Sequence, residues 1–208
     1  MNPTIAGIQV HGMTRGAFLA RSALAAGALY GAAAAGPALT RTLAHEKHGA
    51  FGGGDVAILN FALTLERIEV DFYKRALAVQ GVGADAKKLL QSIAGNEGEH
   101  VQALNQSIAQ LGGKADPAPR TNFPALANEE QVLRLAIDLE DSGVAAYNGA
   151  ATQIVSADVL QAVASIAQVE ARHAGALRAL AGESPTDGPF DDVLSGAEAD
   201  AVVHRLTG

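Results

Sequence analysis

The stretch that decides the fold is "SIAGNEGEH" at residues 92–100, which returns as "SIAQVEARH" at residues 165–173. Both copies lie in Ala- and Leu-rich surroundings typical of helices, yet each places a glutamate three residues before a histidine. A second pair of phrases also repeats, "FALTLERIEVDFY" at 61–73 and "LAIDLEDSGVAAY" at 135–147. The chain therefore contains two copies of one structural unit.

The two copies predict four helices of similar length. Each is bounded by residues that begin or end helices, such as Asp55 as the expected N-cap of the first helix and Gly81 after its end. The expected helices run from about Asp55 to Val79, from about Ala84 to Leu111, from the cap Asn128 to about Val155, and from the cap Ser156 to about Ala181. A short fifth helix is expected from Ser195 to Leu206.

The connections between these helices predict how they are arranged. Short turns at 81–83 and near 156 indicate two antiparallel hairpins, whereas the proline-containing segment 113–127 is expected to be a loop. A helix of ~25 residues is roughly 38 Å long, and a loop of this length reaches about 50 Å when extended. The expected fold is therefore all-α, a four-helix bundle of two antiparallel hairpins joined by a long crossover.

The repeat also shows which polar residues belong to the shared unit. The first helix of each hairpin keeps one Glu and one Tyr, and the second helix keeps Glu-x-x-His. The preserved pairs are Glu66 with Glu140, Tyr73 with Tyr147, Glu97 with Glu170, and His100 with His173. Glu69 and Glu99 are not preserved, since they align with Gly143 and Arg172, and we expect both of them to be solvated or at the rim.

The four preserved glutamates are expected to meet at one level of the bundle. Each lies about 15 residues, or roughly 23 Å, from the turn of its hairpin. Each histidine lies one turn after its Glu on the same helix face. Four carboxylates gathered in a helical core are unfavourable unless they are protonated, face water or bind cations.

This set of side chains matches the ligands of two divalent metal ions. Two such ions bring about four positive charges, which balance four carboxylates, while a neutral imidazole binds each metal. Carboxylate and imidazole ligands suit iron or manganese. A Glu from each of two helices plus Glu-x-x-His from each of two others is the di-iron or di-manganese pattern of ferritin-like bundles. The alternative is that these residues are surface Glu and His on amphipathic helices.

The phrases "FALTLERIEVDFY" and "LAIDLEDSGVAAYNGA" (135–150) resemble those of the ferritin-like superfamily, over roughly residues 52–182. They are most similar to the exported ferritin-like domain group that includes desiccation-associated proteins. The resemblance implies a di-metal centre in which Glu97 and Glu170 are the bridging carboxylates. The implied ligands are Glu66, Glu97, His100, Glu140, Glu170 and His173.

Tyr73 and Tyr147 resemble the tyrosines that lie beside the ligands in rubrerythrin-type sites, with core aromatics as the alternative. The chain departs from rubrerythrins because it contains no cysteine for a rubredoxin-like iron site.

Composition limits the classes of partner and cofactor. The net charge of −7 leaves no basic stripe for nucleic acid. The absence of cysteine excludes disulfides, zinc ribbons, iron–sulfur clusters and thiol catalysis.

Residues 1–44 are expected to be an export signal. Arg15 and Arg21 precede an apolar Ala- and Gly-rich run that is a poor permanent membrane span. "TRGAFLARSAL" resembles a twin-arginine signal, but Gly16 stands where the second Arg belongs, so the Tat and general secretion routes both stay open. A buried N-terminal helix is the alternative, and Met13 is an alternative start.

The expected organisation is therefore an export signal at 1–44, a flexible linker at 45–54, the bundle at 55–182 and a tail with a short helix at 183–208. The expected location is the periplasm or cell envelope.

The expected function is that of a di-metal protein with two Fe ions, or Mn ions in their place. As a di-iron oxidase or peroxidase it would act on dioxygen or peroxide in iron or oxidative-stress handling, with a manganese catalase as its chemical neighbour. The alternative is a non-catalytic protein for metal storage or a structural protein related to desiccation or stress. The metal, the electron donor and assembly into a homo-oligomer stay open.

Overall fold

The computed structural model describes residues 4–5, 8–9, 50–186 and 188–208. The predicted export signal lies outside these residues, except for a short antiparallel pair of strands, β1 (Thr4–Ile5) and β2 (Ile8–Gln9). The chain divides into two units, Met1–Glu46 and Lys47–Gly208, and the second unit holds all of the described helices.

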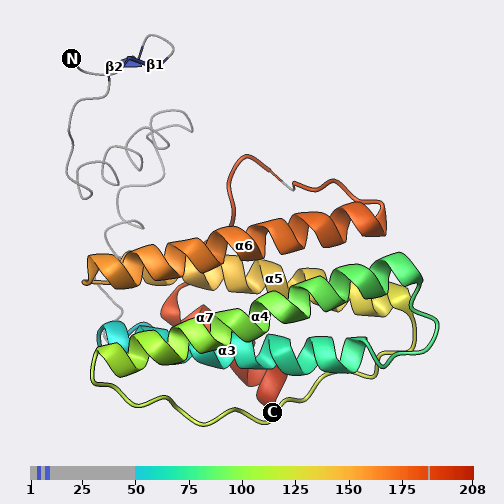
Figure 1. The fold of residues 1–208 in the computed structure, drawn as a ribbon, viewed down its shortest axis with the longest axis horizontal. Helices are drawn as coiled ribbons and strands as arrows, with labels where there is room; N and C mark the ends of the chain where they lie inside the picture. Colours follow the sequence, from blue (N-terminus) through green and yellow to red (C-terminus); the bar gives the residue numbers. More distant parts are fainter. Residues whose placement is uncertain (1–3, 6–7, 10–49, 187) are drawn as a thin grey trace. The chain divides into compact units, whose positions relative to one another are not determined.

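Four long helices and one short helix build the second unit (Figure 1). In chain order they are α3 (Asp55–Ala76), α4 (Ala84–Gln110), α5 (Glu129–Ala151), α6 (Ala157–Ala181) and α7 (Gly196–Thr207). Helix α3 packs mainly against α4, and α5 packs mainly against α6. The all-α bundle of two antiparallel hairpins is therefore confirmed, as is the short C-terminal helix.

The predicted caps of α5 and α6 are confirmed. The side chain of Asn128 accepts a hydrogen bond from the backbone N–H of Gln131, and Ser156 does the same for Val159. Helix α6 ends at Gly182, whose φ of 79° is the left-handed conformation that glycine adopts without strain.

The prediction for Asp55 is wrong, because Gly54 is the N-cap of α3 and makes no side-chain cap. The carboxylate of Asp55 instead accepts hydrogen bonds from the backbone N–H groups of Val155 and Ser156, at 2.8 and 2.7 Å. Asp55 thereby ties the start of α3 to the turn between α5 and α6. Helices α3 and α5 also end three and four residues before the predicted Val79 and Val155.

The crossover between α4 and α5 runs along the bundle, as its length predicted (Figure 1). It is held to α3 at several points. The Asn60 side chain donates to the carbonyl of Lys114 at 3.0 Å and accepts from the N–H of Asp116 at 2.7 Å. Further along α3, Arg75 donates to the Thr121 hydroxyl at 2.8 Å. These contacts hold the crossover along α3.

Two of the three apolar clusters formed by the described residues lie toward opposite ends of the bundle. Leu59, Leu104 and Val163 belong to the cluster around the α3 N-terminus. Phe72 and Leu90 belong to the cluster around the α3 C-terminus. The level between the two clusters is where the sequence places its preserved Glu and His residues. None of the described helices is long and apolar enough to cross a membrane.

The tail after α6 returns to the bundle and packs α7 against α5 and α3. The backbone N–H of Leu194 donates to the carbonyl of Ala145 at 3.0 Å. Gly149 permits this approach, because a Cβ atom there would lie 1.8 Å from the carbonyl oxygen of Leu194. The tail can therefore contact α5 at this point because Gly149 has no side chain.

We expect Gly149→Ala to destabilise the protein by about 1–3 kcal/mol, since the tail backbone must move away from α5. Gly95→Ala is the matched control, because Gly95 is a helical glycine with open space around it. That change is expected to stabilise the protein by about 0.5–1 kcal/mol. Chemical denaturation of the two variants measures both values, and equal effects would contradict the role of Gly149.

Candidate metal centre

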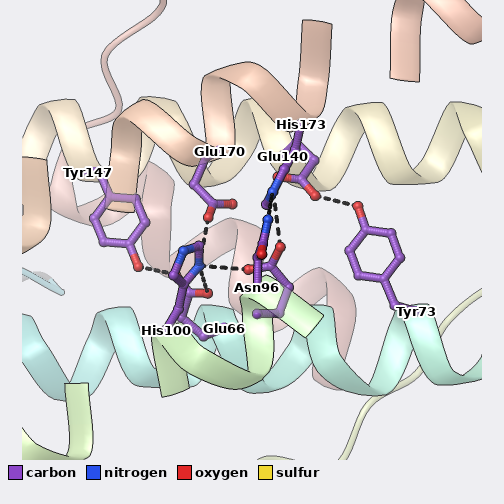
Figure 2. A network of polar contacts seen from close by, with 9 residues as sticks. Glu66, Tyr73, Asn96, His100, Glu140, Tyr147, Glu170 and His173 are labelled. Carbon is purple, nitrogen blue, oxygen red and sulfur yellow. Dashed lines mark hydrogen bonds and ion pairs between the residues drawn. The ribbon is translucent and has the colours of Figure 1, made fainter. Parts of the chain in front are cut away.

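The four long helices each present a buried glutamate to the centre of the bundle, and α4 and α6 each add a histidine (Figure 2). The four Glu side chains are completely buried, and the two histidines are 9% and 6% exposed. The structure brings together all six of the predicted ligands. They are Glu66 from α3, Glu97 and His100 from α4, Glu140 from α5, and Glu170 and His173 from α6.

These six residues form two overlapping groups, in each of which the ligand atoms lie within 4.8 Å of one another. The first group adds Glu66 and His100 to Glu97 and Glu170, and the second adds Glu140 and His173 to the same two glutamates. Glu97 and Glu170 are thus common to both groups. This is the position that the resemblance assigned to the bridging carboxylates.

The distances show that Glu97 spans the space between the two histidines. Its Oε2 lies 2.9 Å from Nδ1 of His100, and its Oε1 lies 3.0 Å from Nδ1 of His173. Glu170 Oε1 lies 3.0 Å from Nδ1 of His100. Both imidazoles therefore direct Nδ1 toward the shared carboxylates, and their ring centres are 6.3 Å apart.

Three oxygens of the shared carboxylates fit a metal site better than a hydrogen-bonded network. Glu97 Oε1 and both carboxylate oxygens of Glu170 are buried and make no hydrogen bond with the described residues. Two of them lie 3.0 Å from an imidazole nitrogen, without the angles of a hydrogen bond. A buried carboxylate oxygen without a partner is costly, and a bound cation removes that cost. Two divalent ions fit these residues by donor type and by charge.

Electrostatics in the metal-free site favour protons on most of the carboxylates. Burial raises the pKa of Glu66, Glu140 and Glu170 well above the usual value, and the neighbouring carboxylates add to the shift. Burial also raises the pKa of Glu97, but the close imidazoles of His100 and His173 outweigh it and lower this pKa to about 2.

His100 is held in its charged form when no metal is bound. Burial lowers its pKa, but the adjacent carboxylates of Glu170, Glu66 and Glu97 outweigh burial and raise the pKa to about 12. Protons thus supply the positive charge that the buried carboxylates require. Metal ions must displace these protons to bind, since ligands bind in their deprotonated forms.

Each of the two tyrosines reaches a glutamate of the other hairpin (Figure 2). The Tyr73 hydroxyl donates to Oε1 of Glu140, and the Tyr147 hydroxyl donates to Oε1 of Glu66. Burial raises the pKa of both tyrosines well above its usual value, and the adjacent carboxylates raise it further. Both phenols therefore keep their protons and hold the two unshared carboxylates in place.

The interpretation of Glu69 as solvated is wrong, because its side chain is only 3% exposed. Burial and the nearby Glu170 raise its pKa well above the usual value. A Cβ atom on Gly143 would lie 3.3 Å from Oε1 of Glu69, so the glycine leaves space for this carboxylate. The three-residue spacing from Glu66 was the signal that could have found it, since it puts both residues on one face of α3. Glu99 is exposed, as predicted.

Asn96 is a further residue that the sequence did not single out. It precedes Glu97 on α4, and its side-chain amide lies 2.9 Å from Nε2 of His173 (Figure 2). Its contact joins the first hairpin to a histidine of the second. The repeat concealed it, because the aligned residue of the other hairpin is Val169.

Two solved structures resemble this fold at low sequence identity. A conserved hypothetical protein from Mycobacterium tuberculosis matches with a TM-score of 0.56 and 17% identity, over 61% of this chain and 96% of its own. A dodecameric thioferritin, the bacterioferritin-related protein from Bacteroides fragilis, matches with a TM-score of 0.57 and 19% identity, over 62% of this chain and 84% of its own. No curated protein matches the chain in sequence.

The family comparison covers the whole bundle. The model of the ferritin-like domain matches residues 54–183, which include all four long helices and all six residues of the two ligand groups. The chain therefore belongs to the ferritin-like domain family.

Proposed function

We propose that this protein is a di-iron oxidase or peroxidase of the ferritin-like family, with manganese as the alternative metal. One observation carries the proposal: two groups of buried ligands share the carboxylates of Glu97 and Glu170. Two metal ions held by these residues would share both carboxylates and could act together on one small molecule. A site for a single structural ion has no need of shared carboxylates.

The metal ions would supply the redox chemistry: two Fe(II) ions give two electrons, which with two protons reduce dioxygen to hydrogen peroxide, or hydrogen peroxide to two water molecules. The protein holds the ligands in place. Glu97 and Glu170 remain between the two positions, and the tyrosine hydroxyls keep Glu66 and Glu140 oriented. The apolar clusters on both sides exclude water from the site.

We also propose that the protein acts outside the cytoplasm, which rests on the signal-like sequence at residues 1–44. Assembly into a homo-oligomer is part of the proposal, because a thioferritin of the same fold is dodecameric. Size-exclusion chromatography with light scattering measures the assembly, and fractionation of cells that express the full chain measures the location.

Anaerobic titration with Fe(II), followed by air or peroxide, tests the redox function. We expect two Fe(II) ions to bind per chain and to be oxidised rapidly, with near-ultraviolet absorption from oxygen-bridged Fe(III). The double variant Glu97→Ala/Glu170→Ala should lose both properties. Glu99→Ala is the control, because it removes an exposed carboxylate from the same helix.

The same titration separates the alternatives. Two bound ions without oxidation would contradict the enzyme and support non-catalytic metal binding or storage. If neither Fe(II) nor Mn(II) binds stoichiometrically, the metal function itself is contradicted and a structural role is favoured.

The stability of the metal-free protein should fall as the pH rises from about 5 to 9. The folded state raises the pKa of Glu66, Glu140 and Glu170 above 4.5 and that of His100 from 6.5 to about 12. Such shifts stabilise the protein fully below the unfolded pKa, and this stabilisation is lost as pH rises toward the folded pKa. The lowered pKa of Glu97 has the opposite effect on stability, but this effect is confined to pH values between about 4.5 and 2.

Metal ions should reverse this trend, because deprotonated ligands bind metal more tightly at higher pH. At a free metal concentration one hundred times Kd, binding stabilises the protein by about 2.7 kcal/mol. Thermal unfolding with and without Mn(II) across this pH range measures both effects. A metal-free protein whose Tm rises with pH would contradict the protonated site.

A further inference from the structure

The two histidines of the site differ in the partner of their Nε2 atom, which lies on the side of the ring away from the carboxylates. Nδ1 of His173 faces Glu97 Oε1 at 3.0 Å and Glu140 Oε2 at 3.2 Å. On the opposite side of the same ring, Nε2 lies 2.9 Å from the amide of Asn96. The hydrogen bonds and ion pairs of His100 with the described residues all involve Nδ1, and its Nε2 makes no hydrogen bond with them.

When Nδ1 of His173 binds a metal, the direction of the hydrogen bond between His173 and Asn96 is fixed. A neutral imidazole that binds through Nδ1 carries its proton on Nε2, which must then donate a hydrogen bond. In the structure the amide nitrogen of Asn96 faces Nε2. With a metal on Nδ1 the amide would present its oxygen instead, which needs only an exchange of the similar amide O and N positions. A partner of this kind fixes the tautomer and ring orientation of a metal-binding histidine and raises its basicity.

Among the described residues, a contact of this kind is found in only one half of the bundle. Asn96 directly precedes Glu97, and the residue that directly precedes Glu170 is Val169. An aliphatic side chain accepts no hydrogen bond. The six ligands of the two groups follow the repeat, whereas the support behind their histidines does not.

We propose that Asn96 is a positioning residue that makes the two metal sites unequal. The group of Glu97, Glu140, Glu170 and His173 binds the first divalent ion, and the group with Glu66 and His100 binds the second ion more weakly. The inference rests on the proposed metal function, although it does not depend on turnover. It assigns an order of filling to a site whose ligands alone are nearly symmetric.

Calorimetric titration of the metal-free full chain with Mn(II) tests this order. We expect two binding steps in the wild type. Asn96→Val, which copies the residue of the other hairpin, should weaken the tighter step by about 10- to 100-fold, so that the two steps merge. Asn96→Asp keeps an acceptor oxygen and should restore the two steps. Val169→Asn should tighten the weaker step.

Electron paramagnetic resonance at one equivalent of Mn(II) provides a readout that a purely structural role would not change. Ordered filling gives mainly chains with a single uncoupled Mn(II), whereas equal sites give a mixture with coupled pairs. We expect the uncoupled signal to dominate in the wild type and in Asn96→Asp, and to decrease in Asn96→Val. Because Asn96 is exposed, the unfolding temperature of the metal-free variants should stay close to that of the wild type.

Unchanged stepwise affinities in Asn96→Val would overturn this inference while leaving the metal function intact. Loss of both binding steps together with a lower metal-free unfolding temperature would also overturn it, since Asn96 would then support the fold. A wild-type chain that binds no Mn(II) or Fe(II) would overturn the proposed function and this inference with it.

Discussion

Five buried carboxylates at one level of a helical bundle are the constraint on which the rest of the structure depends. Glu69 joins the four glutamates of the ligand groups, and all five are almost completely removed from water. Such a cluster is stable only with compensating positive charge. Protons and imidazolium can supply that charge, and divalent cations supply it with a better match to the unpaired oxygens of Glu97 and Glu170. Two bound divalent ions would meet this requirement.

The architecture serves the same cluster by joining two similar halves around it. Each hairpin contributes two helices, and each tyrosine crosses to a glutamate of the other hairpin. The crossover is tied along α3 through Asn60 and Arg75, and Asp55 joins the start of α3 to the turn of the second hairpin. Gly149 lets the tail lie against α5. Contacts between the halves therefore fix the geometry of the site as much as the helices themselves do.

The internal repeat explains why so much of the fold and site could be predicted from one sequence. Residues preserved in both halves, such as Glu66 with Glu140, indicate a common function. Helix periodicity places such residues on one face of each helix. One error arose where the halves differ. Glu69 was taken as solvated because it aligns with Gly143, although that glycine provides the space that the carboxylate fills.

Other features depend on contacts between distant segments, which no local pattern encodes. Asp55 has the residue type of an N-cap, yet its carboxylate binds the backbone of Val155 and Ser156 across the bundle. Asn96 lies beside a predicted ligand of its own helix but acts on His173 of another. The predicted export signal is a property of sequence composition, and it stays a prediction.

The central claim is that two metal ions bind between the shared carboxylates, and anomalous diffraction from crystals grown with Mn(II) tests it most directly. We expect two anomalous peaks per chain, one among Glu66, Glu97, His100 and Glu170 and the other among Glu97, Glu140, Glu170 and His173. A chain with no peak inside the bundle, or with a single peak that leaves either histidine without metal, would contradict it.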